Sequence, residues 1–119
     1  MKLLFCVLVV ALALTVSATA SYFDFEQITV ATASIGFTVS KITPTGLPAM
    51  TYADCRLRTA QINVLWVDPA VTTVSSTVGQ LLEIGDRIIL VKREEILNFR
   101  AIRTGSTSGQ LDCIYKDLP

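Results

Sequence analysis

The 119-residue sequence contains no histidine, and this absence excludes several kinds of active site. Neither a Ser-His-Asp or Cys-His nucleophilic site nor a zinc site with histidine ligands can form without it. The acidic residues stand singly apart from Glu94-Glu95, and no motif marks them as a catalytic carboxylate pair. The alternative is a pair of catalytic carboxylates that are distant in the sequence and are brought together only by folding. We therefore expect a protein that is not an enzyme, with no catalytic residues, no cofactor and no metal site.

An excess of charge of one sign is also missing, because ten basic residues balance ten acidic ones. Lys2 is the only charged residue among the first 20, so residues 21–119 have a net charge of −1. No basic stripe is present, and nucleic-acid binding has no electrostatic support. No phosphate-binding loop is recognisable either, so we expect protein partners and no small-molecule substrate.

The first 20 residues have the features of a secretory signal peptide. Lys2 supplies a positive start, Leu3–Leu14 is unbroken and apolar, and Ala18-Thr19-Ala20 fits a small-x-small cleavage site before Ser21. The alternative is an uncleaved apolar anchor, but the run is short against the roughly 20 residues that cross a bilayer. We expect residues 1–20 to be removed, and residues 21–119 to form one domain that is exported to an extracytoplasmic location.

Two of the three cysteines, Cys55 and Cys113, lie in the exported part. An even number of cysteines in an exported chain favours a disulfide. Each cysteine follows an aspartate and shares a strand face with apolar neighbours, namely Leu57 in one run and Leu111 and Tyr115 in the other. Both sulfur atoms are thus expected in the core. The alternative is a pair of buried free thiols.

Strand signals dominate the remaining sequence, and strong helix patterns are missing. Alternating or β-branched runs between turn residues predict strands at Gln27–Ala31, Ile35–Ile42, Tyr52–Arg58, Gln61–Val67, Arg87–Val91, Leu97–Arg103 and Gln110–Lys116. The last three, within Gly79–Tyr115, have the pattern of an antiparallel meander, with room for one helical turn at Lys92–Ile96. Ser21–Glu26 fits either an edge strand or an arm, and Val71–Val78 stays undecided. The prediction is an all-β domain after the signal segment: a single antiparallel sandwich, a jelly-roll or immunoglobulin-like arrangement, or a partly closed barrel.

Within these runs, alternation predicts which side chains are buried. Both faces of Gln61–Val67 are largely apolar, which indicates a central strand covered on both sides or one face used for assembly. Trp66 is expected in the core on the same grounds. Phe99 and Ala101 share one face of their strand, and we place Phe99 in the core.

The strongest candidates for an interface are Arg100, Ile102 and Arg103. The two guanidinium groups could hold carboxylates of a partner, with Ile102 sealing against it. The alternative is that both arginines pair with acidic residues inside the domain. Tyr22, Phe23 and Trp66 are further candidates for interface anchors, because aromatic side chains are enriched at binding hot spots.

Residues 62–115 resemble a family of small β-structured virion proteins of tailed bacteriophages. The resembling segments are Gln61–Asp68, Thr77–Asp86 and Ile96–Gly105, the last leading into a strand that closes on Tyr115; Phe25–Thr38 fits loosely. The resemblance implies a structural, non-enzymatic component of a capsid or tail, with other virion subunits or copies of itself as partners. A homo-oligomer located in the virion is the corresponding expectation.

A second resemblance is to immunoglobulin-like sandwiches. Cys55, Trp66 and Cys113 follow the Cys–Trp–Cys order of those domains, although Leu111 stands where they place a tyrosine. This similarity implies architecture only. An exported, monomeric β-sandwich that binds a partner is accordingly the alternative to the virion protein.

Overall fold

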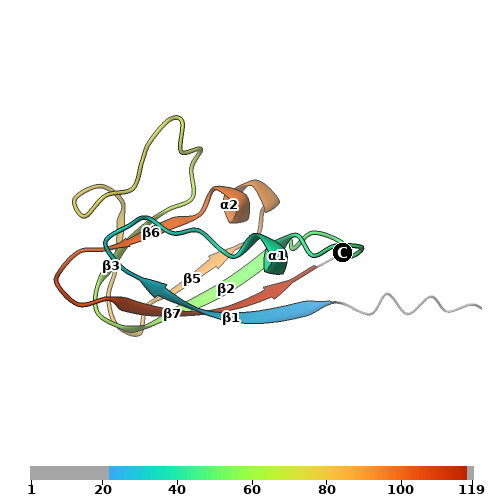
Figure 1. Cartoon of the computed structure of the whole chain (residues 1–119), viewed down its shortest axis with the longest axis horizontal. Helices are drawn as coiled ribbons and strands as arrows, with labels where there is room; N and C mark the ends of the chain where they lie inside the picture. Colours follow the sequence, from blue (N-terminus) through green and yellow to red (C-terminus); the bar gives the residue numbers. More distant parts are fainter. Residues whose placement is uncertain (1–21, 118–119) are drawn as a thin grey trace, which may run out of the picture.

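The computed structural model describes residues 22–117. Seven strands form two antiparallel sheets that pack face to face, so the all-β sandwich is confirmed (Figure 1). The expected signal peptide, residues 1–20, lies outside the described residues. No helix within the described part of the chain is long and apolar enough to cross a membrane.

The larger sheet has four strands in the order β1-β7-β2-β5, and the smaller has three in the order β4-β3-β6. The strands are β1 (Phe23–Val30), β2 (Tyr52–Thr59), β3 (Ile62–Leu65), β4 (Gln80–Leu82), β5 (Arg87–Leu90), β6 (Arg100–Arg103) and β7 (Gly109–Lys116). Two short helices, α1 (Val39–Ile42) and α2 (Arg93–Asn98), lie on the same side of the large sheet as the small sheet (Figure 1).

The core lies between the sheets and follows from alternation along the strands. In β7, Leu111, Cys113 and Tyr115 are fully buried, while the residues between them reach the other face of the sheet. Phe99 is also fully buried and stacks on Phe37 with a ring-centroid distance of 4.1 Å. The prediction for Phe99 is therefore confirmed.

Strand β3 is the central strand of the small sheet, as its two apolar faces indicated. Ile62, Asn63 and Val64 are all buried. The amide of Asn63 donates a hydrogen bond of 3.0 Å to the carbonyl oxygen of Ser75, which ties the loop of residues 66–79 to this sheet. That loop contains the undecided run Val71–Val78, which forms no strand. Trp66, expected in the core, is only partly buried and packs against it from one side.

The expected meander is wrong. Strand β5 pairs with β2, β6 pairs with β3, and β7 lies between β1 and β2. These last three strands therefore alternate between the two sheets and do not pair with one another. The reason is that local pattern predicts where strands lie but not which strands pair, since pairing depends on residues far apart in the sequence.

Two of the predicted strands include residues that are helical in the structure. Ile35–Ile42 forms only an isolated bridge from Ile35 to Ala101 and then turns into α1. The cause is Glu26, whose carboxylate accepts hydrogen bonds from the backbone N–H and the hydroxyl of Thr38, the N-cap residue immediately before α1. In the run Leu97–Arg103, the first two residues complete α2, and the strand begins only at Arg100.

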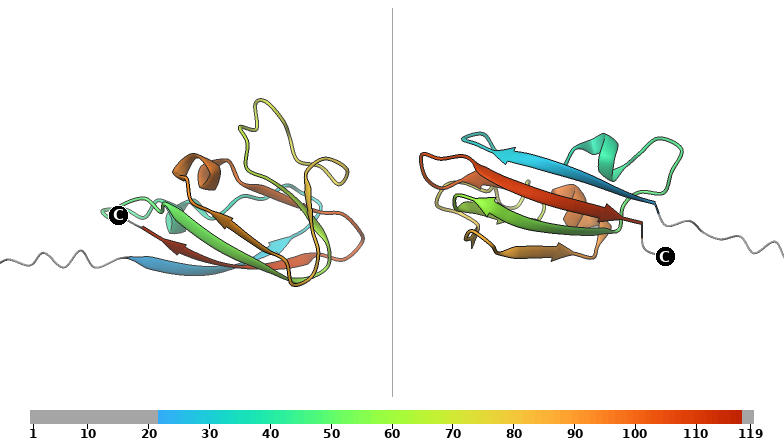
Figure 2. Two further views of the ribbon diagram at one scale, coloured as in Figure 1. Left: turned by 180° about the vertical axis from the view of Figure 1, so that it is seen from behind. Right: turned by 90° about the horizontal axis from the view of Figure 1, so that it is seen from below.

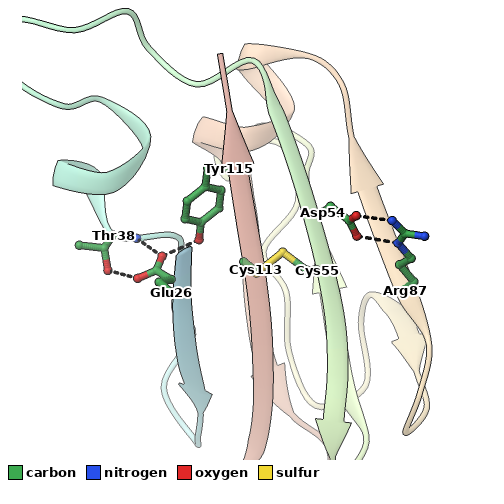
Figure 3. The surroundings of a disulfide bond; sticks show 7 residues. All are labelled: Glu26, Thr38, Asp54, Cys55, Arg87, Cys113 and Tyr115. Atoms are coloured by element: carbon green, nitrogen blue, oxygen red, sulfur yellow. Dashed lines mark hydrogen bonds and ion pairs between the residues drawn. A yellow bond between two sulfur atoms is a disulfide. The ribbon is translucent and has the colours of Figure 1, made fainter. Parts of the chain in front are cut away.

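The two cysteines also do not occupy the positions that they have in immunoglobulin domains. Cys55 and Cys113 are register partners on the neighbouring strands β2 and β7, with Cα atoms 4.1 Å apart. Their disulfide lies within one sheet, whereas the disulfide of an immunoglobulin domain joins two sheets. Figure 3 shows the bond between the two strands. The predicted pairing of these cysteines itself is confirmed, and both are fully buried.

Candidate functional site: the outer face of the large sheet

One face of the four-stranded sheet is covered by no other element of the described chain (Figure 2, right). We call it the outer face. It carries every second side chain of β1, β7, β2 and β5. These residues are Phe23, Phe25, Gln27, Thr29, Gln110, Asp112, Ile114, Lys116, Tyr52, Asp54, Arg56, Arg58, Arg87 and Ile89. Because the opposite face builds the core, alternation forces these residues outward whatever their chemistry.

The outer face is unusually apolar at one end. Phe23 is 69% exposed and Phe25 is 54% exposed, and Ile114 and Ile89 are also exposed. A shallow depression lies between Phe23, Phe25, Ile114 and Lys116. Exposed aromatic side chains grouped on a flat sheet are a feature of protein-binding surfaces.

The strand register arranges the outer face in rows that cross all four strands. One row is apolar apart from a single carboxylate and consists of Phe25, Ile114, Asp54 and Ile89. The next row is polar and consists of Gln27, Asp112, Arg56 and Arg87. The row on the other side of the apolar one contains Phe23, Lys116 and Tyr52. An apolar band thus lies beside a band that carries charges of both signs.

Ion pairs neutralise most of the acidic groups on this face. Arg87 binds both carboxylate oxygens of Asp54, as the dashed lines in Figure 3 show, and its hydrogen bonds hold the pKa of Asp54 below its ordinary value of 3.8. Asp112 accepts hydrogen bonds from Gln27 at 3.1 Å and from Arg58 at 3.2 Å. Arg56 has no salt bridge within residues 22–117. The outer face therefore presents Arg56 as a cation available to a partner.

The opposite face of the same sheet holds a buried carboxylate, that of Glu26. It accepts hydrogen bonds from the hydroxyl of Tyr115 at 2.5 Å, from the backbone N–H of Thr38 at 2.9 Å and from the hydroxyl of Thr38 at 2.6 Å (Figure 3). Burial, and then the hydrogen bond to Glu26, raise the pKa of the Tyr115 phenol above its ordinary value of 10.0. This network joins β1, β7 and the start of α1, and we assign it a structural role.

The residues predicted as an interface lie elsewhere, on β6 of the small sheet. Arg100, Ile102 and Arg103 are all half-buried. One nitrogen of Arg100, Nη1, donates to the carbonyl oxygens of Leu97 at 3.2 Å and Phe99 at 2.6 Å. None of the salt bridges within residues 22–117 involves either arginine, so the alternative of ion pairs inside the domain is not found.

The free edge of β6 is also partly occupied. Ala101 exchanges backbone hydrogen bonds with Ile35, and the backbone N–H of Arg103 donates to the carbonyl oxygen of Ala31. An interface at β6 stays a prediction, but less of its surface is open than on the outer face.

Sequence reasoning found part of the outer face and missed the rest. Phe23 was a candidate anchor, whereas Phe25, Ile114 and Ile89 were not recognised. The signal was present in β1, where Glu26, Ile28 and Val30 alternate with the outward residues and fix Phe25 on the outer side. The prediction divided this strand into Ser21–Glu26 and Gln27–Ala31, so the alternation across the boundary was not recognised. Tyr22, another candidate anchor, is partly buried against the core.

Comparisons with known proteins do not identify the chain. It matches no protein-family model, no curated protein and no solved structure. Within residues 22–117, no group of three or more cysteine or acidic side chains is placed to hold a metal ion.

Proposed function

We propose that the protein is a non-enzymatic assembly protein that joins protein subunits through the outer face of its large sheet. The observation that carries this proposal is the exposure of Phe23 and Phe25 beside Ile114 on an uncovered sheet. Burying such a surface against a partner is favourable by about 25 cal/mol for each Å² of apolar area removed from water. Aromatic side chains are also enriched in the cores of interfaces.

The first candidate setting is the particle of a tailed bacteriophage. The resemblance of residues 62–115 to small virion proteins supports it, because those proteins are structural. In this setting the partner is another virion subunit or a second copy of the chain.

The second candidate is an exported, monomeric β-sandwich that binds a partner outside the cytoplasm. The Cys55–Cys113 disulfide favours this candidate, because disulfides form and persist mainly in oxidising compartments. Cleavage between Ala20 and Ser21 is part of it. The intact mass of the protein recovered from producing cells tests the cleavage, and a protein that keeps residues 1–20 would contradict it.

Hydroxyl-radical footprinting tests the proposed contact. We expect Phe23 and Phe25 to be labelled less in assembled material from producing cells than in the dissociated protein. Val71 is a matched control, because it is 78% exposed and lies in the loop of residues 66–79, away from the outer face. Equal labelling of both phenylalanines in the two samples would refute the contact.

A further inference from the structure

We propose that the partner at the outer face is a second copy of this chain, docked outer face to outer face. The two-fold axis runs parallel to the strands, between β7 and β2. This inference rests on the proposed function and specifies its partner. Half a turn about this axis places β7 over β2 of the second copy and β1 over β5, and it keeps every row at its own level. The contact is isologous, so each pairing occurs twice.

The polar row is complementary to itself under this rotation. Asp112 meets Arg56 of the second copy, and Arg56 meets Asp112, while each Asp112 keeps the salt bridge to Arg58 and the hydrogen bond from Gln27 of its own chain. Arg56 has no salt bridge within residues 22–117 and gains one here. These two residues lie on the strands next to the axis, where the twist between packed sheets displaces facing side chains least.

The two neighbouring rows also come face to face. Phe25 meets Ile89 of the second copy, so the two largest apolar groups at the margins of the row cover each other. Ile114 meets Asp54, whose carboxylate is already neutralised by Arg87. Lys116 meets Tyr52; within one chain the Lys116 ammonium already lies 5.4 Å from the centre of that ring, a cation–π contact that the second copy can extend.

Two other symmetric contacts fit the same residues less well. An axis across the strands, between the polar and apolar rows, would place the charges of one row on the apolar groups of the other. Pairing through the edge of β1 is obstructed by α1, because Lys41 donates a hydrogen bond of 2.9 Å to the carbonyl oxygen of Phe25. The parallel axis avoids both of these obstacles.

Mixing two charge variants tests this arrangement. Arg56→Asp makes the central pair of the polar row acidic in both copies, and Asp112→Arg makes it basic. Each variant alone is expected to dimerise at least about tenfold more weakly than the wild type, because like charges then face each other across the axis. An equimolar mixture is expected to restore the affinity as a one-to-one heterodimer, measured by sedimentation equilibrium. Neighbours within one chain cannot produce this rescue.

The outcomes separate this inference from the proposed function. In one outcome, the wild type stays monomeric at millimolar concentration while Phe23 and Phe25 are protected in assembled material. This result would show that the partner is not a second copy, but it would still support the proposed assembly contact at the outer face. Wild-type affinity in each single variant, or no rescue in the mixture, overturns the axis. If either charge variant fails to fold, Ile89→Glu tests the same geometry, because it places a carboxylate against Phe25 of the second copy. Its control is Val71→Glu, and equal dimerisation of these two variants overturns the proposal.

Discussion

At the scale of single residues, the core and the proposed contact both depend on which side of a strand each side chain occupies. Phe99 is fully buried and stacks on Phe37, which in turn meets the ring of Tyr115 edge to face at 5.1 Å. These three rings form the aromatic centre of the core, and aromatic pairs add to the energy of area burial. The outer-face phenylalanines, by contrast, contribute little to folding because they stay in water.

Removing the Phe99 ring should therefore destabilise the domain severely. Phe99→Ala is expected to lower the free energy of unfolding by about 3–5 kcal/mol, because it leaves a cavity that the neighbouring rings cannot fill. Denaturant unfolding measures this change. Val71→Ala is the control, with an expected change within about 0.5 kcal/mol. A loss below about 1 kcal/mol for Phe99→Ala would show that the ring is not in the core.

Tyr115 should stay protonated in the folded protein at alkaline pH. Its raised pKa means that the folded state disfavours the phenolate, so unfolding above pH 10 releases a proton and stability falls as the pH rises through that region. At a fixed pH near 11, denaturant unfolding of the wild type should increase tyrosinate absorbance by one tyrosine more than unfolding of Tyr115→Phe. Identical increases would contradict the burial of the phenol and its bond to Glu26.

At the scale of strands and helices, much of the fold could be predicted from the sequence. Alternation located β2, β3, β5 and β7, and matched apolar neighbours identified the disulfide. Strand partners could not be predicted, because β7 comes to lie between β1 and β2 only through contacts distant in sequence. The end of the Ile35–Ile42 run was missed for a similar reason, since Thr38 is fixed by a carboxylate from another strand. Strand β4 was missed because it has only three residues.

The candidate site was harder to predict than the fold. Glu26 is an acidic residue at an inward position, and only the tertiary structure supplies the hydroxyl and amide donors that make this possible. The rows of the outer face likewise exist only once four strands are in register. Arg100 and Arg103 were predicted as interface residues because they are two charges on one strand. The sequence could not show that their side chains are half-buried.

The disulfide ties β2 to β7 at the middle of the large sheet, so we expect it to stabilise the element on which the outer face is built. Replacing both Cys55 and Cys113 by alanine should lower the free energy of unfolding by about 2–4 kcal/mol, because the unfolded chain loses a cross-link. Alkylation before and after reduction, read by mass spectrometry, should detect the bond in the native protein. Two thiols that react before reduction would contradict it.

At the scale of the whole molecule, the two faces of the large sheet have different roles. The inner face makes the core, with the disulfide and the Glu26 network holding its strands together. The outer face is left apolar and uncovered, with charges of both signs in one row. A domain of this size needs only one face of each sheet to fold, so an exposed aromatic band is best explained by a partner.

Sedimentation equilibrium of the wild type, Phe25→Ser and Val71→Ser is the most direct test of this central claim. Both variants replace one exposed apolar side chain, but only Phe25 lies on the outer face. We expect the wild type and Val71→Ser to form the same oligomer at high concentration, whereas Phe25→Ser sediments as a folded monomer. A Phe25→Ser protein that keeps the mass and affinity of the wild-type oligomer would contradict it.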